Sequence, residues 1–165
     1  MQNTKDSFYL ALRDRLSALD PSRSVTLNGV TRPAILVAEN ESATAAVPLP
    51  NAFYIHWLGM QAAKGYDNAT KPLLEFTCRI DYWTEGTFDN AFQDRGRSLA
   101  ALDSELLQIC APSRTLLMDH TQTPAVTLNS IIFWSRPVFA SPIADGRRLL
   151  RSAQLTVFSY AEFVC

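Results

Sequence analysis

The sequence predicts an α+β fold: an antiparallel or mixed β-sheet with one N-terminal helix and one long central helix packed on one face, and with long hairpin loops. Residues 74–82 alternate strictly between apolar and polar, which is the period of a strand with one buried and one wet face. After a turn at residues 84–86, apolar residues recur at helical spacing as far as Ile109. A strand that leads directly into a long helix indicates a helix lying across the apolar face of a sheet.

Length and composition predict one globular domain over residues 1–165. The chain is 47% apolar and has a formal net charge of −1. A uniformly basic nucleic-acid-binding protein would carry a clear positive excess, so this charge disfavours that class and leaves room only for a local basic patch. No apolar run approaches the roughly 20 residues that span a bilayer, and residues 1–6 lack the apolar core of a signal sequence, so no membrane partner is predicted.

The cysteines and arginines bear on the redox environment and on partners. Cys78, Cys110 and Cys165 are odd in number and widely spaced, which argues against a disulfide framework or a zinc site and favours a reduced, cytosolic folding environment. Arginine outnumbers lysine by 12 to 3. Because arginine is enriched at protein interfaces, this ratio favours a surface that meets other proteins, although a bias in genomic composition explains it about equally well.

The first third of the chain predicts one helix followed by short extended segments. A helix is expected over residues 4–19, ended by Asp20 and Pro21, because proline cannot continue the hydrogen-bond ladder. Its apolar stripe consists of Phe8, Leu12, Leu16 and Leu19. Residues 24–38 are interpreted as two short strands around an Asn28-Gly29 turn. Residues 39–51, which are rich in small residues and proline, are expected to form a loop.

A β-hairpin with a long tip is predicted next. Residues 52–58 alternate as a strand, with Tyr54 and His56 on its polar face. The 14 residues 59–72 connect this strand to the strand over residues 74–82, and a connection of that length usually serves a purpose or is disordered. The tip supplies four candidate protein contacts, which are Lys64, Tyr66, Asp67 and Lys71.

The long helix is expected over residues 87–109 and is stopped by Pro112. Its buried stripe is predicted to contain Phe88, Phe92, Leu99, Leu102, Leu106 and Ile109. Gly96 interrupts the pattern at a cost of up to roughly 1 kcal/mol in a helix interior. Either a close backbone approach or simple tolerance explains that glycine.

Two late strands complete the expected order of helix, strands, helix, strands. Residues 126–134 are strongly β-forming, and residues 150–164 form a longer alternating segment. Residues 135–148 are expected to be a connection, because they contain Pro137, Pro142 and Gly146.

The sequence predicts neither a catalytic site nor a metal site. A cysteine nucleophile would need His56 or His120 beside it, but a free cysteine is more commonly a small buried hydrophobe. Asp119 and His120 are adjacent on an extended segment and point to opposite faces, so they are poorly placed to share a metal ion. The chain has no glycine-rich phosphate loop and no nucleophile elbow, so no cofactor and no catalytic residue is assigned.

Four further residues are candidate protein contacts. Arg147, Arg148 and Arg151 form a basic cluster that would suit an acidic partner surface or a phosphate, but a solvated turn explains the cluster more simply. Trp83 falls on the polar side of its strand, where an exposed aromatic ring would indicate a contact surface and a ring packed under a loop would not.

The order of elements, together with three short segments, resembles the tail terminator (tail completion) proteins of long-tailed bacteriophages and phage head–tail joining proteins. The segments are Arg32-Pro33-Ala34-Ile35 after a turn, Ile80-Asp81-Tyr82-Trp83 before the long helix, and Ile132-Phe133-Trp134-Ser135 late in the chain. The resemblance covers nearly the whole chain by element order. It contains no catalytic motif that could be transferred to residues of this sequence.

The resemblance implies a non-enzymatic virion protein that forms a ring, typically a hexamer, at the junction of tail and neck after assembly in the host cytoplasm. Such a ring would dock on the tail tube protein, stop tail polymerisation and meet the neck or head–tail connector. DNA would pass through it without sequence-specific binding. One alternative is another tail or neck component, such as a tube-like or baseplate-joining subunit. The other is an α+β ligand-binding domain or enzyme, for which Tyr54, His56 and Arg79 would be the residues to inspect first.

Overall fold

The computed structural model describes residues 1–41, 48–66 and 70–162. Its helices are α1 (Gln2–Leu19), α2 (Ala38–Glu41), the 3-10 helix η1 (Phe88–Asn90) and α3 (Arg95–Ile109). Its strands are β1 (Ser24–Leu27), β2 (Val30–Pro33), β3 (Ile35–Val37), β4 (Phe53–Ala62), β5 (Leu73–Thr84), β6 (Arg114–Asp119), β7 (Val126–Trp134), β8 (Val138–Phe139), β9 (Ile143–Asp145) and β10 (Arg148–Tyr160). The predicted α+β class is confirmed.

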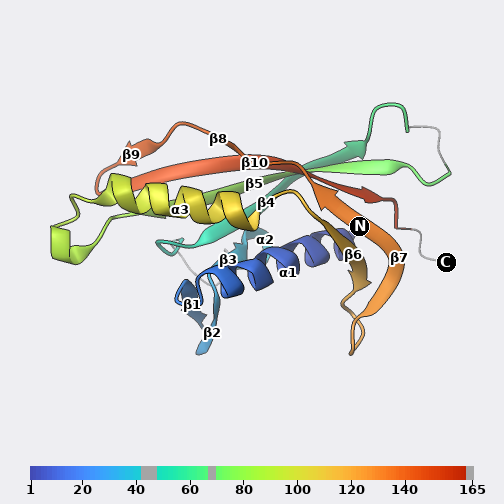
Figure 1. Ribbon diagram of the computed structural model, residues 1–165, viewed down its shortest axis with the longest axis horizontal. Coiled ribbons are helices and arrows are strands. Elements are labelled where there is room, and N and C mark those ends of the chain that lie inside the picture. Colours follow the sequence, from blue (N-terminus) through green and yellow to red (C-terminus); the bar gives the residue numbers. More distant parts are fainter. Residues whose placement is uncertain (42–47, 67–69, 163–165) are drawn as a thin grey trace.

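One mixed sheet organises most of the described chain, in the order β3-β4-β5-β10-β7-β6. All of its neighbouring strands are antiparallel except β3 and β4, which are parallel. Strands β8 and β9 pair with β10 along the edge that β7 also uses, so residues 135–145 run back along β10 as the arm of one long hairpin. Strands β1 and β2 form a separate two-stranded hairpin below α1 in Figure 1.

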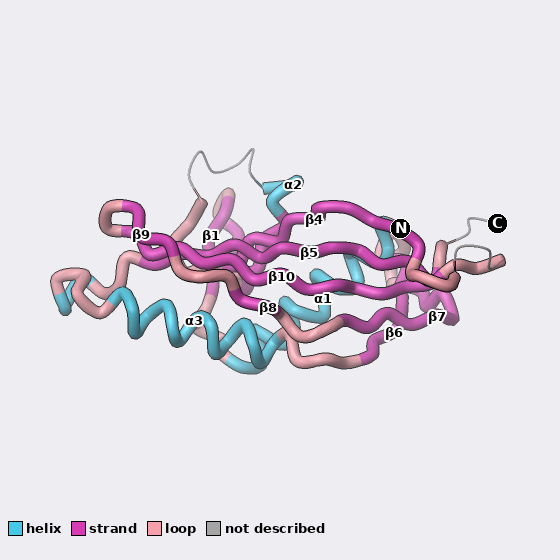
Figure 2. Tube along the Cα trace, turned by 90° about the horizontal axis from the view of Figure 1, so that it is seen from above, coloured by secondary structure: helices cyan, strands magenta, loops and turns pink. Residues whose placement is uncertain are grey.

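Helices α1 and α3 lie on one face of this sheet, and Figure 2 looks onto the other face, with α1 behind the strands. The core between the two layers contains completely buried side chains from α1 (Phe8, Leu12, Leu16) and nearly completely buried ones from α3 (Leu102, Leu106). The alternating strand β5 turns its apolar residues into this core, as predicted. Within the described residues no helix is both long and apolar enough to span a membrane.

The predicted helix over residues 87–109 is wrong in its first eight residues. Ala91 and Phe92 have φ angles of 49° and 64°, which interrupt helical geometry, and α3 begins only at Arg95. The cause is Asp94, whose carboxylate accepts hydrogen bonds from the Thr87 backbone N–H (2.7 Å) and side chain (2.8 Å) and so closes a local loop. Phe88 is therefore 82% exposed instead of buried.

That loop also explains why a glycine stands at position 86. Because the loop delays the start of α3, Gly96 does not lie in a helix interior. Gly86 has a φ of +83°, and a Cβ there would lie 2.5 Å from a carboxylate oxygen of Asp94. Gly96, expected in the helix interior, is the second residue of α3, where it costs less. A Cβ on Gly96 would meet no atom within 4 Å in the described structure, so the suggested close backbone approach is wrong.

Four other boundaries differ from the prediction. Strand β4 continues through Ala62, so the hairpin connection is shorter than residues 59–72. Residues 38–41 form α2 within the expected loop over residues 39–51. The connection over residues 135–148 contains β8 and β9, and β10 ends at Tyr160 instead of residue 164. Strand β6 was not predicted, because its sequence RTLLMD has three consecutive apolar residues and no alternation.

Candidate functional site

The sheet face without a helix is the candidate functional site, called here the open face. Strand alternation places Tyr54 and His56 of β4 and Arg79 and Asp81 of β5 on this face. The register pairs Tyr54 with Asp81 and His56 with Arg79. The residues that the ligand-binding alternative singled out therefore do lie together.

A charged network joins three of these side chains. The carboxylate of Asp81 lies 3.1 Å from Nε2 of His56 and 3.0 Å from Nη2 of Arg79. Their side chains are 32%, 37% and 42% exposed for His56, Asp81 and Arg79. Water competes with contacts this accessible, so the network orients the guanidinium and the imidazole but stabilises the fold little.

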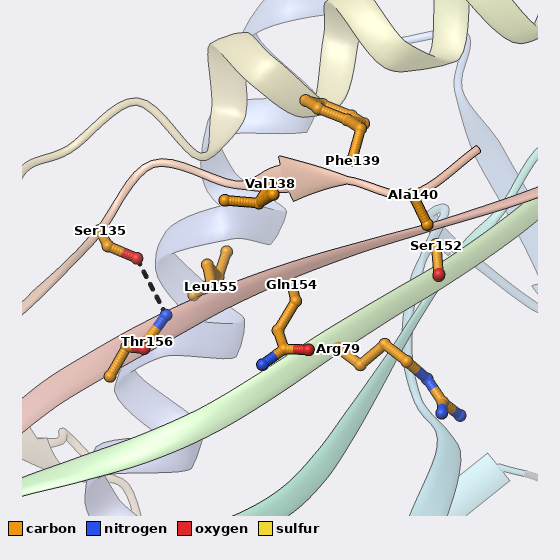
Figure 3. A pocket seen from close by; sticks show the side chains of 9 residues that line it. All are labelled: Arg79, Ser135, Val138, Phe139, Ala140, Ser152, Gln154, Leu155 and Thr156. Atoms are coloured by element: carbon orange, nitrogen blue, oxygen red, sulfur yellow. Dashed lines mark hydrogen bonds between the residues drawn. The ribbon is translucent and has the colours of Figure 1, made fainter.

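Two adjoining cavities lie over this face. One of about 610 Å³ has Tyr54, His56 and Asp81 in its floor and Ile143 on its rim. The other, of about 470 Å³, is the cavity of Figure 3, in which Arg79, Ser152 and Gln154 come from the central strands and Val138 and Phe139 from β8. Arg79, Ala140 and Ser152 line both cavities. Together they make a shallow trough along β10.

The hairpin tip between β4 and β5 holds three of the predicted contact residues in the described chain. Lys64 and Lys71 are exposed, and Tyr66 is 44% exposed. Asp67, the fourth, lies outside the described residues. The tip extends beyond the body of the sheet at the upper right of Figure 1.

The arginine cluster near the start of β10 is largely engaged within the chain. Arg148 stacks over the ring of Trp83 at 4.6 Å and lies 3.9 Å from Glu85. Arg151 turns to the helix face and donates to Asp103 of α3 at 2.9 Å. Arg147 is exposed, with its guanidinium 5.5 Å from the ring of Phe92. Of the three, Arg147 is the one most available to an external partner.

Trp83 is only 7% exposed. Of the two interpretations of its position on the polar side of β5, the structure supports a ring packed beneath neighbouring residues. Arg148 covers one side of it, and it also lines the larger cavity of the open face. In the isolated chain this ring is not an exposed contact surface.

Asp103 connects three elements on the helix face. It accepts hydrogen bonds from the hydroxyl of Tyr82 on β5 and from Arg151 on β10. Burial, and then the hydrogen bond with Asp103, raise the pKa of Tyr82 well above its usual value. This network fixes α3 to the two central strands.

The cysteines have the properties of buried hydrophobes. Cys78 and Cys110 are completely buried, and burial raises the pKa of the Cys78 thiol and takes that of Cys110 to about 12. Cys78 points to the helix face, whereas His56 points to the open face. Cys165 lies outside the described residues.

Asp119 and His120 do not form a shared ligand pair. The carboxylate of Asp119 accepts hydrogen bonds from the backbone and side chain of Thr121, and Nε2 of His120 lies 3.4 Å from the hydroxyl of Ser7. Among the described residues, no three His, Cys, Asp or Glu side chains are grouped so that they could hold a metal ion.

Sequence reasoning missed one feature of the open face, a row of side chains that crosses five strands. Its members are Gln61, Glu75, Phe158, Phe133 and Arg114. Alternation alone could assign some of these residues to a face. No local signal could show that residues 97 positions apart in the chain, Gln61 and Phe158, belong to the same row.

Comparisons with known proteins add little to this geometry. No family model and no curated protein matches the chain. A solved structure of the virion of a native gene transfer agent particle contains a chain that matches with a TM-score of 0.37 and 13% sequence identity, covering 95% of this chain and 94% of that chain. A TM-score this low does not establish a common fold.

Proposed function

We propose that this chain is a non-enzymatic structural subunit of a phage-like virion. Its main contacts are with other copies of itself, and these copies assemble head-to-tail into a ring. In the finer form of the proposal the ring is a hexamer at the end of the tail tube. It stops tail polymerisation and joins the tail to the neck. The tube protein and a neck or connector protein are then its partners.

The observation that carries the proposal is that the sheet ends in two different edges. At one side, β3 pairs only with residues 53–55 of β4, so in the described chain no strand pairs with residues 56–62 on the side of β4 away from β5. At the other side, β6 pairs only with β7. Exposed apolar side chains lie at both edges, Leu58 and Met60 at the first and Leu116 at the second.

Two unlike edges favour association of one edge with the other, and not of each edge with itself. Exposed strand edges with apolar side chains tend to pair with another chain. When unlike surfaces of identical subunits meet, the contact repeats head-to-tail and forms a ring wherever the rotation closes. A ring subunit therefore accounts for both edges with one kind of contact.

The element order supports the phage-tail form of the proposal. Helix, strands, helix and strands follow one another as in the tail terminator proteins that the sequence resembles. The quoted segments fall at the end of β2 and start of β3, in β5 and at the end of β7. The exposed tip with Lys64, Tyr66 and Lys71 would reach a neighbour or the tail tube.

Native mass spectrometry and negative-stain imaging of the purified chain test this proposal. The expected result is a closed ring of identical subunits with a hollow centre that binds the end of a purified tail tube. A strictly monomeric chain at a concentration of roughly 100 μM, with no binding to tubes, would contradict it, since specific subunit contacts commonly persist at micromolar concentrations. The larger cavity of the open face, of about 610 Å³, would then favour the second candidate, a ligand-binding domain.

A further inference from the structure

The row of side chains on the open face joins one sheet edge to the other. The register runs from Gln61 to Glu75, then to Phe158, Phe133 and finally Arg114, with one residue from each of β4, β5, β10, β7 and β6. Cross-strand neighbours of this kind are the closest side-chain contacts that a sheet makes. The row is therefore continuous over the width of the sheet.

Interactions within the chain account for all of the row except its last member. The amide of Gln61 donates to the carboxylate of Glu75 at 3.1 Å. The rings of Phe158 and Phe133 are stacked, with centroids 5.0 Å apart and planes inclined by 10°. Arg114 is exposed and makes no ion pair with any described residue. The row thus ends in an acid near the β4 edge and in an unpaired cation at the β6 edge.

A second, apolar row lies two residues further along the same strands. Leu73 pairs with Tyr160, and Ile131 pairs with Leu116. The register that joins β10 to β7 ends with Ser159 opposite Ile132, and one further step would place Tyr160 opposite Ile131. Leu116 at the β6 edge is 55% exposed and Tyr160 is 40% exposed. This row also ends in a side chain that no neighbouring strand covers.

We propose that the β6 edge of one copy packs along the β4 edge of a second copy, with Arg114 of the first reaching Glu75 of the second. This inference rests on the proposed ring and names its contact. The rows then continue from subunit to subunit. Leu116 of one copy comes to lie beside Ala63, just after β4 of the next copy, and Leu73 of the same apolar row lies one strand further away.

The strand directions suit this contact at residues 114–116 of β6, whereas the backbone of Met118 further along β6 is already hydrogen-bonded to Ser7 of α1. Four antiparallel steps separate β4 from β6, so the two strands run in the same direction and head-to-tail copies would place them parallel. Neighbouring strands lie about 4.8 Å apart, so Arg114 would have Gln61 of the second copy beside it and Glu75 about 10 Å away between backbones. An extended arginine and an extended glutamate together cover that separation.

Charge complementarity favours a second copy over an unrelated partner. The same chain carries the cation on one edge and the carboxylate near the other, in one row, so a single head-to-tail contact pairs them. Complementary charges at an interface fix the register and exclude wrong pairings. The contact would also cover the exposed Leu116.

Charge reversal at the two sites tests the contact. The variants are Arg114→Glu, Glu75→Arg and the double variant that carries both changes, each examined by native mass spectrometry and sedimentation velocity. Arg97→Glu is the matched control, because Arg97 is also exposed but lies on α3. Circular dichroism and thermal unfolding establish that each variant folds.

Each single reversal is expected to weaken ring assembly at least about tenfold in subunit concentration, the equivalent of roughly 1.4 kcal/mol. The double variant is expected to regain most of the assembly of the wild type, and Arg97→Glu to assemble normally. Folded single variants that assemble like the wild type would overturn the contact while leaving the ring itself intact. A double variant that stays as weak as the singles would also overturn it. A wild-type chain that remains monomeric would instead remove the ring, and the contact with it.

Discussion

The two faces of the central strands differ sharply although alternate residues of the same strands form them. On β5, the side chains of Phe76, Cys78, Ile80 and Tyr82 are at most 2% exposed, whereas Arg79 and Asp81 between them are more than a third exposed. The first set packs against α1 and α3, and the second set faces the trough. Alternate positions of one strand therefore serve the fold and the surface separately.

Polar groups differ between the faces as well. On the helix face, Asp103 joins Tyr82 to Arg151, and Arg23 is held by Glu105 of α3 through two hydrogen bonds of 2.7 and 2.9 Å. On the open face, Asp81 is shared between His56 and Arg79 in contact with water. The covered face should therefore govern stability, and the open face should govern contacts with other molecules.

Truncation of one phenylalanine on each side of the sheet should lower the stability of the fold by very different amounts. Phe8 of α1 is completely buried and contacts the rings of Trp57 and Trp134, so Phe8→Ala should cost about 3–5 kcal/mol in the free energy of unfolding. Phe133 is partly exposed on the open face, so Phe133→Ala should cost about 1 kcal/mol through loss of one aromatic stack. Urea denaturation measures both values. Equal losses would mean that the two faces contribute alike to the fold.

The buried thiols provide a second test, because only the covered face should couple stability to alkaline pH. Burial raises the pKa of Cys110 to about 12, from 9.0 for an accessible thiol. Above about pH 9 the unfolded chain loses this proton and the folded chain keeps it, so stability falls as pH rises and is unaffected at neutral pH.

The expected size follows from that pKa difference. Between about pH 8 and about pH 10.5, the free energy of unfolding of the wild type should fall by about 2 kcal/mol more than that of a Cys110→Ala variant. Urea denaturation at several pH values measures the difference, which cancels the contributions of other titrating groups. Parallel pH profiles for the two proteins would show that this thiol is not protected from solvent.

The sequence predicted the covered face better than the open face. The strand over residues 126–134 is confirmed as β7, and the helix over residues 4–19 is confirmed as α1 with two additional residues at its start. Both depend on local signals, which are the β-forming residues of the strand and the helical spacing of apolar residues in the helix. The prediction of the first turns of the central helix was wrong because the hydrogen bonds of Asp94 with Thr87 compete with helix formation. The spacing of apolar residues gives no sign of these hydrogen bonds.

Most features of the open face could not be predicted from the sequence, because they depend on pairings between distant segments. Alternation placed Tyr54, His56 and Arg79 on one polar face, as the structure has them. The trough above them needs Val138 and Ile143, which came from a segment expected to be a plain connection. The row from Gln61 to Arg114 needs β10 to lie between β5 and β7, and that strand order is a property of the whole sheet.

Removal of one charge from a polar contact on each face should change stability by a smaller amount, and by less on the open face. Arg23 and Glu105 are 22% and 15% exposed and form a two-pronged contact, so Glu105→Gln should cost about 1–2 kcal/mol in the free energy of unfolding. Asp81→Asn on the open face makes the same change of charge and shape at an accessible site and should cost less than about 0.5 kcal/mol. Urea denaturation at about 0.1 M and about 1 M salt measures both, and the first cost should depend less on salt because partly buried pairs are screened less. A larger cost for Asp81→Asn would place part of the stability of the fold on the face that is proposed to be free for assembly.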